Sequence, residues 1–386
     1  MKAYLDNAAT TPLDPEVLEA MLPVLRDVYG NPSSIHASGR QARSLVERAR
    51  KTVAELLGAS PAEIFFTSGG TESNNTILCG AIESYNLRHV ITSPLEHHAV
   101  LHTLENLRNN GKIRLSYLTV NESGDISQDE LEALLAGNDR TLVSLMHGNN
   151  EIGNLNDIQA IGSLCAAHGA LFHSDTVQTM GHFRHNVQNL DVNFMVGAAH
   201  KFHGPKGIGF FYQKAGTRIQ PFIHGGAQER NMRGGTENVY GIVGLAKALE
   251  IAYRDMATHE HAIRSLKMHM KSMLEERIEG VLFNGRSADP DRSLYTVLNV
   301  SLPMSEISDM LLFNLDIAGI CASGGSACAS GTDIGSHVLQ AIQATSERPS
   351  VRFSFGKYST TEEVEYAVEV LEGLFRKNPR ALEKSA

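Results

Sequence analysis

Short apolar runs alternate with amphipathic segments through the middle of the chain. The apolar runs cover residues 64–67, 89–93, 113–120, 141–147, 170–175 and 194–211. A helical pattern follows each of the first four runs. The first ends at residue 85, the second covers residues 98–107, the third begins near residue 127, and the fourth covers residues 157–168. Strands that alternate with helices at this spacing predict a mainly parallel sheet with helices on both faces. The fold class predicted for this part is therefore α/β.

The pattern differs on both sides of this alternation. A helix is predicted over residues 15–26, and a long helical region over residues 238–278. Beyond it, apolar runs at residues 295–302, 317–323 and 350–356 stand apart from one another and are followed by a final helix. Separated strands mixed with helices predict a smaller α+β domain.

The length of the chain also predicts two domains, because 386 residues exceed what a single hydrophobic core usually supports. We expect a large domain over residues 15–255. Residues 1–14 together with residues 256–386 are expected to form the small domain.

The composition narrows the classes of protein. The net charge is -9 without a long block of one sign, so we expect no nucleic acid ligand, because phosphate binding needs clustered Lys and Arg. The 4 cysteines lack the spacing of a small disulfide scaffold, which favours a reducing compartment. Neither a signal-peptide core nor a membrane-spanning run is evident. We therefore expect a cytoplasmic protein that does not bind membranes.

Polar residues stand at the ends of several predicted strands. Thr71, His97, Asn150, Asp175 and Lys201 each lie at or just after such an end. In sheets of parallel strands, ligands bind outside the carboxyl ends. We therefore expect these side chains to share one site.

Lys201 is the first candidate for chemistry, because it stands between an apolar run and a Gly-Pro loop. A buried lysine has a lowered pKa and forms Schiff bases with carbonyl compounds such as pyridoxal phosphate, PLP. Taken alone, the stretch favours a lysine that reaches into solvent from a strand end.

Two further features suit the same cofactor. Residues 68–73, SGGTES, join a strand to a helix, where backbone amides and the helix dipole favour a phosphate; a Gly-Gly turn is also common there for steric reasons. The carboxylate of Asp175 suits a protonated pyridine nitrogen, although alone it is an ordinary strand-end aspartate. With Lys201, these features predict a PLP site.

A zinc hydrolase is a rival class, suggested by the 17 histidines. His98 and His102 stand four residues apart on a predicted helix, a spacing that metal sites often use. Neither a third ligand nor a nearby carboxylate base is evident on that helix, so a solvated face is the favoured interpretation and no metal is expected.

Cys328 lies in a run of Gly and Ser, residues 323–331, that favours neither strand nor helix. We predict that its thiol stands on a mobile loop. A structural cysteine usually lies among apolar residues, so a reactive role is favoured for Cys328. Cys79, Cys165 and Cys321 lie in predicted helices or a strand, and core packing is expected for each.

A series of motifs between residues 5 and 356 resembles the cysteine desulfurases in the order of that family. The motifs are LDNAATTP, GNPSSIH, FTSGGTESNN, EHHAV, HGNNEIG, HSDTVQ, AAHKFHGPKGIGF, HGGAQERNMRGGTEN, SGGSACASG and SVRFSFG. The resemblance implies the aminotransferase-like fold of type I PLP enzymes, class V. The separation of Cys328 and Arg352 is similar to that in the long-loop branch.

The reaction that this resemblance implies converts L-cysteine to L-alanine and leaves the sulfur on Cys328 as a persulfide. A homodimer and delivery to a sulfur-acceptor protein, such as an iron-sulfur scaffold or a tRNA-thiolation relay, are implied as well. Selenocysteine lyase and cysteine-sulfinate desulfinase activities are alternatives on the same scaffold.

The resemblance also implies roles for individual residues. The catalytic residues would be Lys201 as the Schiff-base lysine, Cys328 and His97. The cofactor contacts would be Asp175 at the pyridine nitrogen, Gln178 at the ring oxygen, His97 on the ring, and Gly70, Thr71, His200 and the neighbouring subunit's Thr236 at the phosphate. The substrate contacts would be Asn31, Asn150 and Arg352.

Ala198 departs from the family pattern, which often has a serine three positions before the lysine. One hydrogen bond to the phosphate is therefore expected to be missing or replaced, which would weaken cofactor binding without removing the chemistry.

Overall fold

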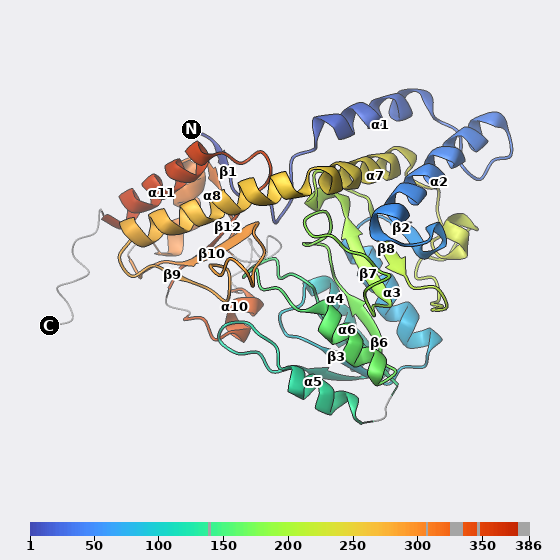
Figure 1. Cartoon of the computed structure of the whole chain (residues 1–386), viewed down its shortest axis with the longest axis horizontal. Helices are drawn as coiled ribbons and strands as arrows, with labels where there is room; N and C mark the ends of the chain where they lie inside the picture. The colour runs from blue at the N-terminus through green and yellow to red at the C-terminus, as the bar shows by residue number, and fades with distance from the viewer. Residues whose placement is uncertain (138–139, 306–307, 325–334, 346–347, 377–386) are drawn as a thin grey trace.

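The larger sheet of the computed structural model has seven strands in the order β2-β8-β7-β6-β5-β3-β4 (Figure 1). The structure describes residues 1–137, 140–305, 308–324, 335–345 and 348–376. Within this sheet only β8 runs antiparallel to its neighbours, so the predicted mainly parallel sheet is confirmed. The strands are β2 (Ile64–Thr67), β3 (His89–Thr92), β4 (Arg114–Tyr117), β5 (Thr141–Ser144), β6 (Leu171–Ser174), β7 (Phe194–Ala198) and β8 (Gly209–Gln213).

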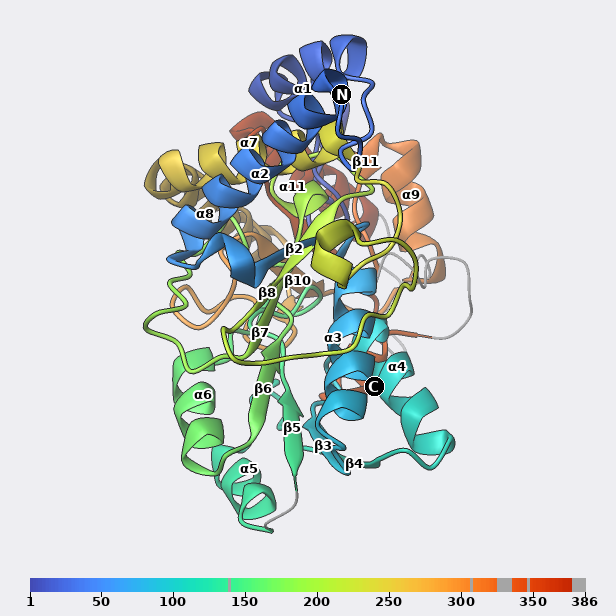
Figure 2. The same cartoon turned by 90° about the vertical axis from the view of Figure 1, so that its right-hand side faces the viewer.

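Helices cover both faces of the large sheet, as Figure 2 shows for α3 and α4 on one side and α5 and α6 on the other. Successive strand residues point to opposite faces; accordingly Phe65 and Phe211 pack on one side, whereas Phe66 and Phe210 pack on the other. The helices of this part are α1 (Pro15–Asp27), α2 (Ala37–Leu57), α3 (Gly70–Ser84), α4 (His98–Asn109), α5 (Gln128–Leu135), α6 (Ile158–Ala167) and α7 (Val239–Arg254).

Two smaller sheets form beside the large one. Strands β12, β10 and β9 pair antiparallel, and β1 pairs parallel with β11. Their strands are β1 (Ala3–Tyr4), β9 (Leu282–Phe283), β10 (Val297–Ser301), β11 (Ile320–Cys321) and β12 (Ser350–Ser354). The helices here are α8 (Met256–Arg277), α9 (Leu311–Ile317), α10 (His337–Ala341) and α11 (Thr361–Arg376). Among the described helices, none combines the length and apolar character that crossing a bilayer requires.

The long helical region expected over residues 238–278 consists of two helices. Asp255 caps the end of α7 and the start of α8, with backbone angles outside the helical range. The run at residues 317–323 is also shorter as a strand than expected. Gly319 has a φ of 78°, which ends α9 because glycine adopts this conformation without strain, and only Ile320–Cys321 form β11.

Separate hydrophobic cores lie under the large sheet and the smaller sheets. The two cores on the large sheet draw their buried residues from positions 17–256. The core of the smaller sheets draws its buried residues from positions 3–5 and 263–371. The division into a large domain of residues 15–255 and a small domain of residues 1–14 with 256–386 stays a prediction.

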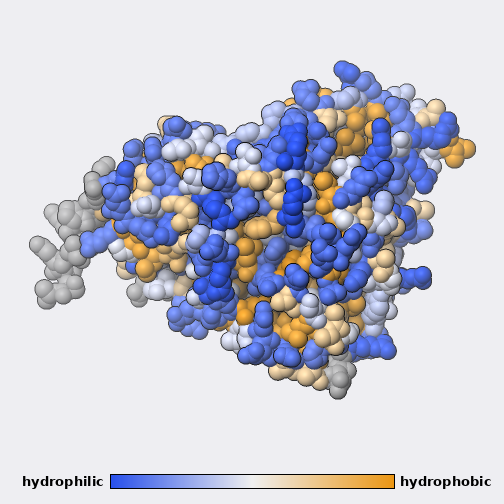
Figure 3. Space-filling model, in the orientation of Figure 1, coloured by the Kyte–Doolittle hydropathy of each residue, from blue (hydrophilic) through white to orange (hydrophobic). Residues whose placement is uncertain are grey.

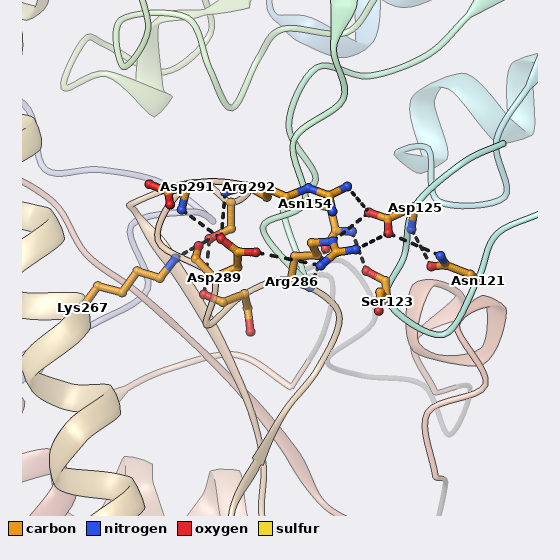
Figure 4. Close-up of polar contacts among 11 residues, drawn as sticks. Asn121, Ser123, Asp125, Asn154, Lys267, Arg286, Asp289, Asp291 and Arg292 are labelled. Atoms are coloured by element: carbon orange, nitrogen blue, oxygen red, sulfur yellow. Dashed lines mark hydrogen bonds and ion pairs between the residues drawn. The ribbon is translucent and has the colours of Figure 1, made fainter. Parts of the chain in front are cut away.

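Polar contacts join the segments after β4 and after β5 to residues 286–292 (Figure 4). Asp125 accepts a hydrogen bond from Nε of Arg286 at 2.9 Å, and Nη2 of Arg292 also donates to it, at 3.1 Å. Asn154 accepts from the backbone amide of Arg286 at 2.9 Å and donates to Ser123 at 2.7 Å. Since Asn154 follows Asn150 by four residues, these contacts hold in place the segment that carries a predicted site residue.

Candidate active site

A cavity of about 250 Å³ lies at the carboxyl ends of the central strands and brings most of the predicted site residues together. The predicted residues that line it are Gly70, Thr71, His97, Asn150, Asp175, Gln178, His200, Lys201 and Arg352. The polar residues expected at separate strand ends, Thr71, His97, Asn150, Asp175 and Lys201, thus line one cavity, and their roles in a functional site stay a prediction.

Lys201 enters the cavity from a short 3-10 helix, Ala199–Lys201, directly after β7. Its Nζ donates hydrogen bonds to the carbonyl oxygens of Ala8 at 2.6 Å and Ala9 at 2.9 Å. From behind, Nε2 of His182 donates to the backbone oxygen of Lys201 at 3.2 Å. The half-buried amine is thus held at the cavity wall by the N-terminal segment.

Asp175 is buried and oriented by a chain of hydrogen bonds. Nδ2 of Asn74 donates to Oδ2 of Asp175 at 2.7 Å, and Oδ1 of Asn74 lies 3.0 Å from Nε2 of His173. Nδ1 of His173 lies 2.9 Å from Oγ of Ser144. Burial lowers the pKa of His173 to about 4, so this ring is neutral at pH 7, with Nε2 as donor and Nδ1 as acceptor. This series of hydrogen bonds orients the carboxylate of Asp175, which lines the cavity.

The N-terminus of α3 forms one end of the cavity. Gly70 begins this 15-residue helix, and a Cβ there would meet Cγ2 of Val177 at 2.8 Å, so the position excludes larger residues. His200 also lines the cavity and contacts Oγ1 of Thr10 through Nδ1 at 3.2 Å. Burial lowers the pKa of His200 to about 4. Free amides at a helix start and a neutral imidazole suit an anion such as a phosphate.

His97 caps the start of α4, because its Nδ1 accepts a hydrogen bond from the amide of Ala99 at 3.1 Å. The proton of the neutral ring therefore stands on Nε2. Burial also lowers the pKa of His97, which favours this neutral form. His97 can donate a proton from Nε2, whereas protonation at Nδ1 would cost the helix cap.

Arg352 reaches the cavity from β12 and is 1% exposed. Its Nη1 donates to the backbone oxygen of Asn150 at 2.9 Å, and its Nη2 donates to Oδ1 of Asp6 at 2.8 Å. Nε is buried and has no hydrogen-bond partner among the described residues. The guanidinium therefore keeps donors available for a carboxylate ligand.

Three predicted site residues lie elsewhere. Thr236 lines a separate cavity of about 120 Å³ together with Ser68 and Arg233. Asn31 is exposed and does not line the cavity of Lys201. Cys328 lies outside the described residues.

Several residues of the cavity wall were not predicted from the sequence, namely Ala8, Ala9, Asn74, Met146, Gly148 and Val177. Asn74 follows Gly70 by four positions on the same helix, so helical periodicity places both on one face and this signal was available. Glu96, a fully buried carboxyl next to His97 in the sequence, was not predicted either. Oε1 of Glu96 accepts from the amide of Met146 at 2.7 Å, and burial raises the pKa of Glu96 well above its usual range.

The histidine pair that suggested zinc forms an aromatic stack. The rings of His98 and His102 lie 4.7 Å apart at 29°, and His337 lies 4.5 Å from His98. Within the described part of the chain, no group of three or more His, Cys, Asp or Glu side chains is placed to hold a metal ion.

The chemical groups around the cavity fit PLP. A carboxylate suits the protonated ring nitrogen, a lysine amine suits the aldehyde, and a helix N-terminus suits the phosphate. Asp175, Lys201 and Gly70 supply these three groups around one cavity.

Comparison with known proteins agrees with this chemistry. Residues 3–367 match the family model of the class-V aminotransferases. The cysteine desulfurase IscS of Dictyoglomus turgidum is 43% identical over 380 residues, which cover 97% of this chain and 95% of that protein. The chain belongs to the cysteine desulfurase family. A putative cysteine desulfurase, IscS 1 of Bacillus subtilis, is 41% identical and is covered to 97%, with 95% of this chain matched.

Solved structures share the fold of this chain. A NifS-like protein superposes with a TM-score of 0.90 and 38% identity, covering 98% of this chain and all of the other. The structure described as SspA in complex with cysteine superposes with a TM-score of 0.80 and 32% identity, covering 93% of this chain and all of the other. The fold type expected from the sequence motifs is thereby confirmed.

Proposed function

We propose that this desulfurase uses PLP to convert L-cysteine to L-alanine and that Cys328 receives the sulfur as a persulfide. The observation that carries the proposal is the convergence of Lys201, Asp175 and Arg352 on one cavity. A lysine amine, a carboxylate for the ring nitrogen and a guanidinium for an amino-acid carboxylate are the groups that PLP chemistry on an amino acid requires.

Cofactor binding is assigned to residues around the whole cavity. When bound, PLP supplies an electron sink conjugated to the substrate α-carbon. Asp175 would hold the ring nitrogen protonated, and Gly70, Thr71 and His200 would hold the phosphate. Gln178, whose Nε2 now donates to Ala8 at 3.0 Å, would contact the ring oxygen, and His97 would lie against the ring.

Substrate turnover is assigned to four side chains. Arg352 and Asn150 would bind the carboxylate of L-cysteine, and Nζ of Lys201 would take the α-proton. The thiolate of Cys328 would attack the substrate sulfur, so that an S–S bond forms and the C–S bond breaks. The electron pair of the broken bond stays with the substrate β-carbon, which takes up a proton to give alanine.

A homodimer is proposed, on the basis of two observations. Thr236 lines a different cavity from Lys201, so a contact of Thr236 with a phosphate suits the partner's site. Leu18, Leu22 and Leu25 expose 41%, 46% and 49% of their surface along α1, and Figure 3 shows hydrophobic surface in this upper-right region. Asn31 lies beyond the same helix and is assigned to the same contact region.

The acceptor of the sulfur is proposed to be a protein, such as an iron-sulfur scaffold. Relatives that bear the names IscS and NifS-like support this class of acceptor. A reducing cytoplasm is the proposed compartment, since the described cysteines Cys79, Cys165 and Cys321 are all free thiols. Side-by-side assays with selenocysteine and cysteine sulfinate distinguish the alternative activities.

Substitution of Cys328 tests the proposal. Cys328→Ala is expected to keep the visible absorbance of the bound cofactor and to lose alanine formation and transfer of ³⁵S to an acceptor. Cys321→Ala is the matched control, because Cys321 lies in β11 and is expected to retain turnover. Continued alanine production by Cys328→Ala with an acceptor present would contradict the assignment.

A further inference from the structure

Asp6 forms an ion pair with Arg352 and compensates the positive charge of its guanidinium. Oδ1 of Asp6 accepts from Nη2 of Arg352 at 2.8 Å and from Oγ of Ser323, also at 2.8 Å. The side chain of Arg352 is 1% exposed and that of Asp6 is 18% exposed. A buried guanidinium without a counter-ion is strongly unfavourable, so Asp6 supplies the negative charge that Arg352 needs when no substrate is bound.

The guanidinium lines the cavity and keeps unused hydrogen-bond donors for a second anion. Of its five N–H groups, one on Nη1 is bonded to Asn150 and one on Nη2 to Asp6, whereas Nε has no partner among the described residues. Asp6 itself does not line the cavity. It therefore acts on a ligand only through Arg352 and through its own charge.

We propose that Asp6 is a positioning residue that fixes the plane of Arg352 and, as a resident counter-ion, moderates the affinity of the site for amino-acid carboxylates. This inference rests on the proposed function, which assigns Arg352 to the substrate carboxylate. Two anions near one guanidinium repel each other, so the charge of Asp6 stabilises the empty site and weakens substrate and product binding. Release of alanine thereby becomes faster.

The same carboxylate connects this site to the segment that leads to Cys328. Ser323 precedes Cys328 by five positions, and its amide and carbonyl groups pair with those of Arg352 at 3.3 and 2.7 Å. One carboxylate oxygen of Asp6 therefore bridges the side chains of Arg352 and Ser323.

The test compares ligand affinity and stability in the holoenzyme. Asp6→Asn keeps the acceptor oxygen and removes the charge, so titration of the cofactor absorbance with L-alanine is expected to give a Kd lowered by about fivefold. The thermal midpoint is expected to fall, because Arg352 loses its counter-ion. A role in packing alone predicts a lower midpoint with equal or weaker binding, and that result would overturn the proposal.

Three variants separate charge from hydrogen bonding. Ser323→Ala removes the other hydrogen bond to the same oxygen at constant charge, and Asp125→Asn removes a carboxylate paired with Arg286 outside the cavity. Both are expected to keep the wild-type Kd for L-alanine, and equal tightening in either would overturn the proposal. Asp6→Ser, which also removes the charge but keeps an acceptor oxygen, replaces Asp6→Asn if the latter does not fold.

If the proposed desulfurase activity is wrong, the wild-type holoenzyme neither binds L-alanine nor releases it from L-cysteine. Normal wild-type binding with an unchanged Kd in both Asp6 variants contradicts only the role of Asp6.

Discussion

Nδ2 of Asn74 donates a hydrogen bond to Oδ2 of Asp175 at 2.7 Å, and both side chains are buried. A hydrogen bond to a charged group contributes about 1.5–3 kcal/mol, which corresponds to about tenfold or more in an equilibrium constant. In Asn74→Ala, Asp175 loses this donor and His173 loses its acceptor. We expect cofactor affinity and kcat each to fall by about tenfold or more, measured by cofactor titration and alanine formation.

The neighbouring Asn75 supplies the control for that measurement. Its Nδ2 donates to the backbone of its own helix at Thr71 and its Oδ1 accepts from Thr103, without contact to Asp175. Asn75→Ala is expected to stay close to wild type. An equal loss in both variants would indicate general damage to α3 instead of a specific effect on Asp175.

Ala198→Ser tests the departure from the family pattern. Ala198 lines the cavity and is 1% exposed, so a hydroxyl there gains a position beside the bound cofactor. One additional hydrogen bond to a charged phosphate is expected to tighten cofactor binding by about tenfold. Equilibrium dialysis of the cofactor measures this change, and an unchanged affinity would show that backbone amides already satisfy the phosphate.

Glu229→Gln is expected to destabilise the protein strongly. Arg50 and Glu229 form two hydrogen bonds, at 2.7 and 2.8 Å, and both side chains are 3% exposed. Glu229→Gln leaves the buried guanidinium of Arg50 with the exposed carboxylate of Glu47, at 3.3 Å, as its remaining acidic partner. Breaking a buried ion pair costs about 3–5 kcal/mol of unfolding free energy. Urea unfolding measures the loss. Asp27→Asn is the control, since the Arg26–Asp27 pair is exposed, and it is expected to give no measurable loss.

Buried histidines predict acid sensitivity below neutral pH. Burial lowers the pKa of His173, His182 and His185 from 6.5 to about 4. Between these values the unfolded chain binds protons that the folded chain excludes, so the unfolding free energy falls as the pH decreases. Each histidine contributes about 1.4 kcal/mol per pH unit in this window.

Urea unfolding at pH 7.5 and pH 5.5 measures this dependence. His185→Gln is expected to reduce the difference between the two pH values, because one group that titrates only in the unfolded chain is gone. A difference that does not change in this variant would show that His185 binds a proton equally well in both states.

The sequence predicted the sheet and the strand-end side of the site well. Parallel strands place their carboxyl ends on one edge, so His97, Asp175 and Lys201 could be placed together from local patterns alone. In contrast, Ala8 contacts Lys201 across 193 positions, and no periodicity around Ala8 indicates such a contact. Its carbonyl oxygen is a backbone group, which the type of residue does not reveal.

Tertiary packing also determines the surroundings of His98 and His102. Helical spacing correctly placed His98 and His102 on one face of α4, but it carried no information about what faces them. His337 comes from a distant part of the chain, and its ring packs tilted against that of His98. The four-residue spacing therefore predicted that His98 and His102 contact each other, whereas the ring that packs against them is determined by tertiary contacts.

The cavity takes one wall from Ala8 and another from Arg352, which lie far apart in the sequence. A polypeptide without β12 would keep Lys201 and Asp175 but lose Arg352. The complete cavity therefore forms only after these distant segments have packed beside the large sheet, so its formation is a marker of completed tertiary folding.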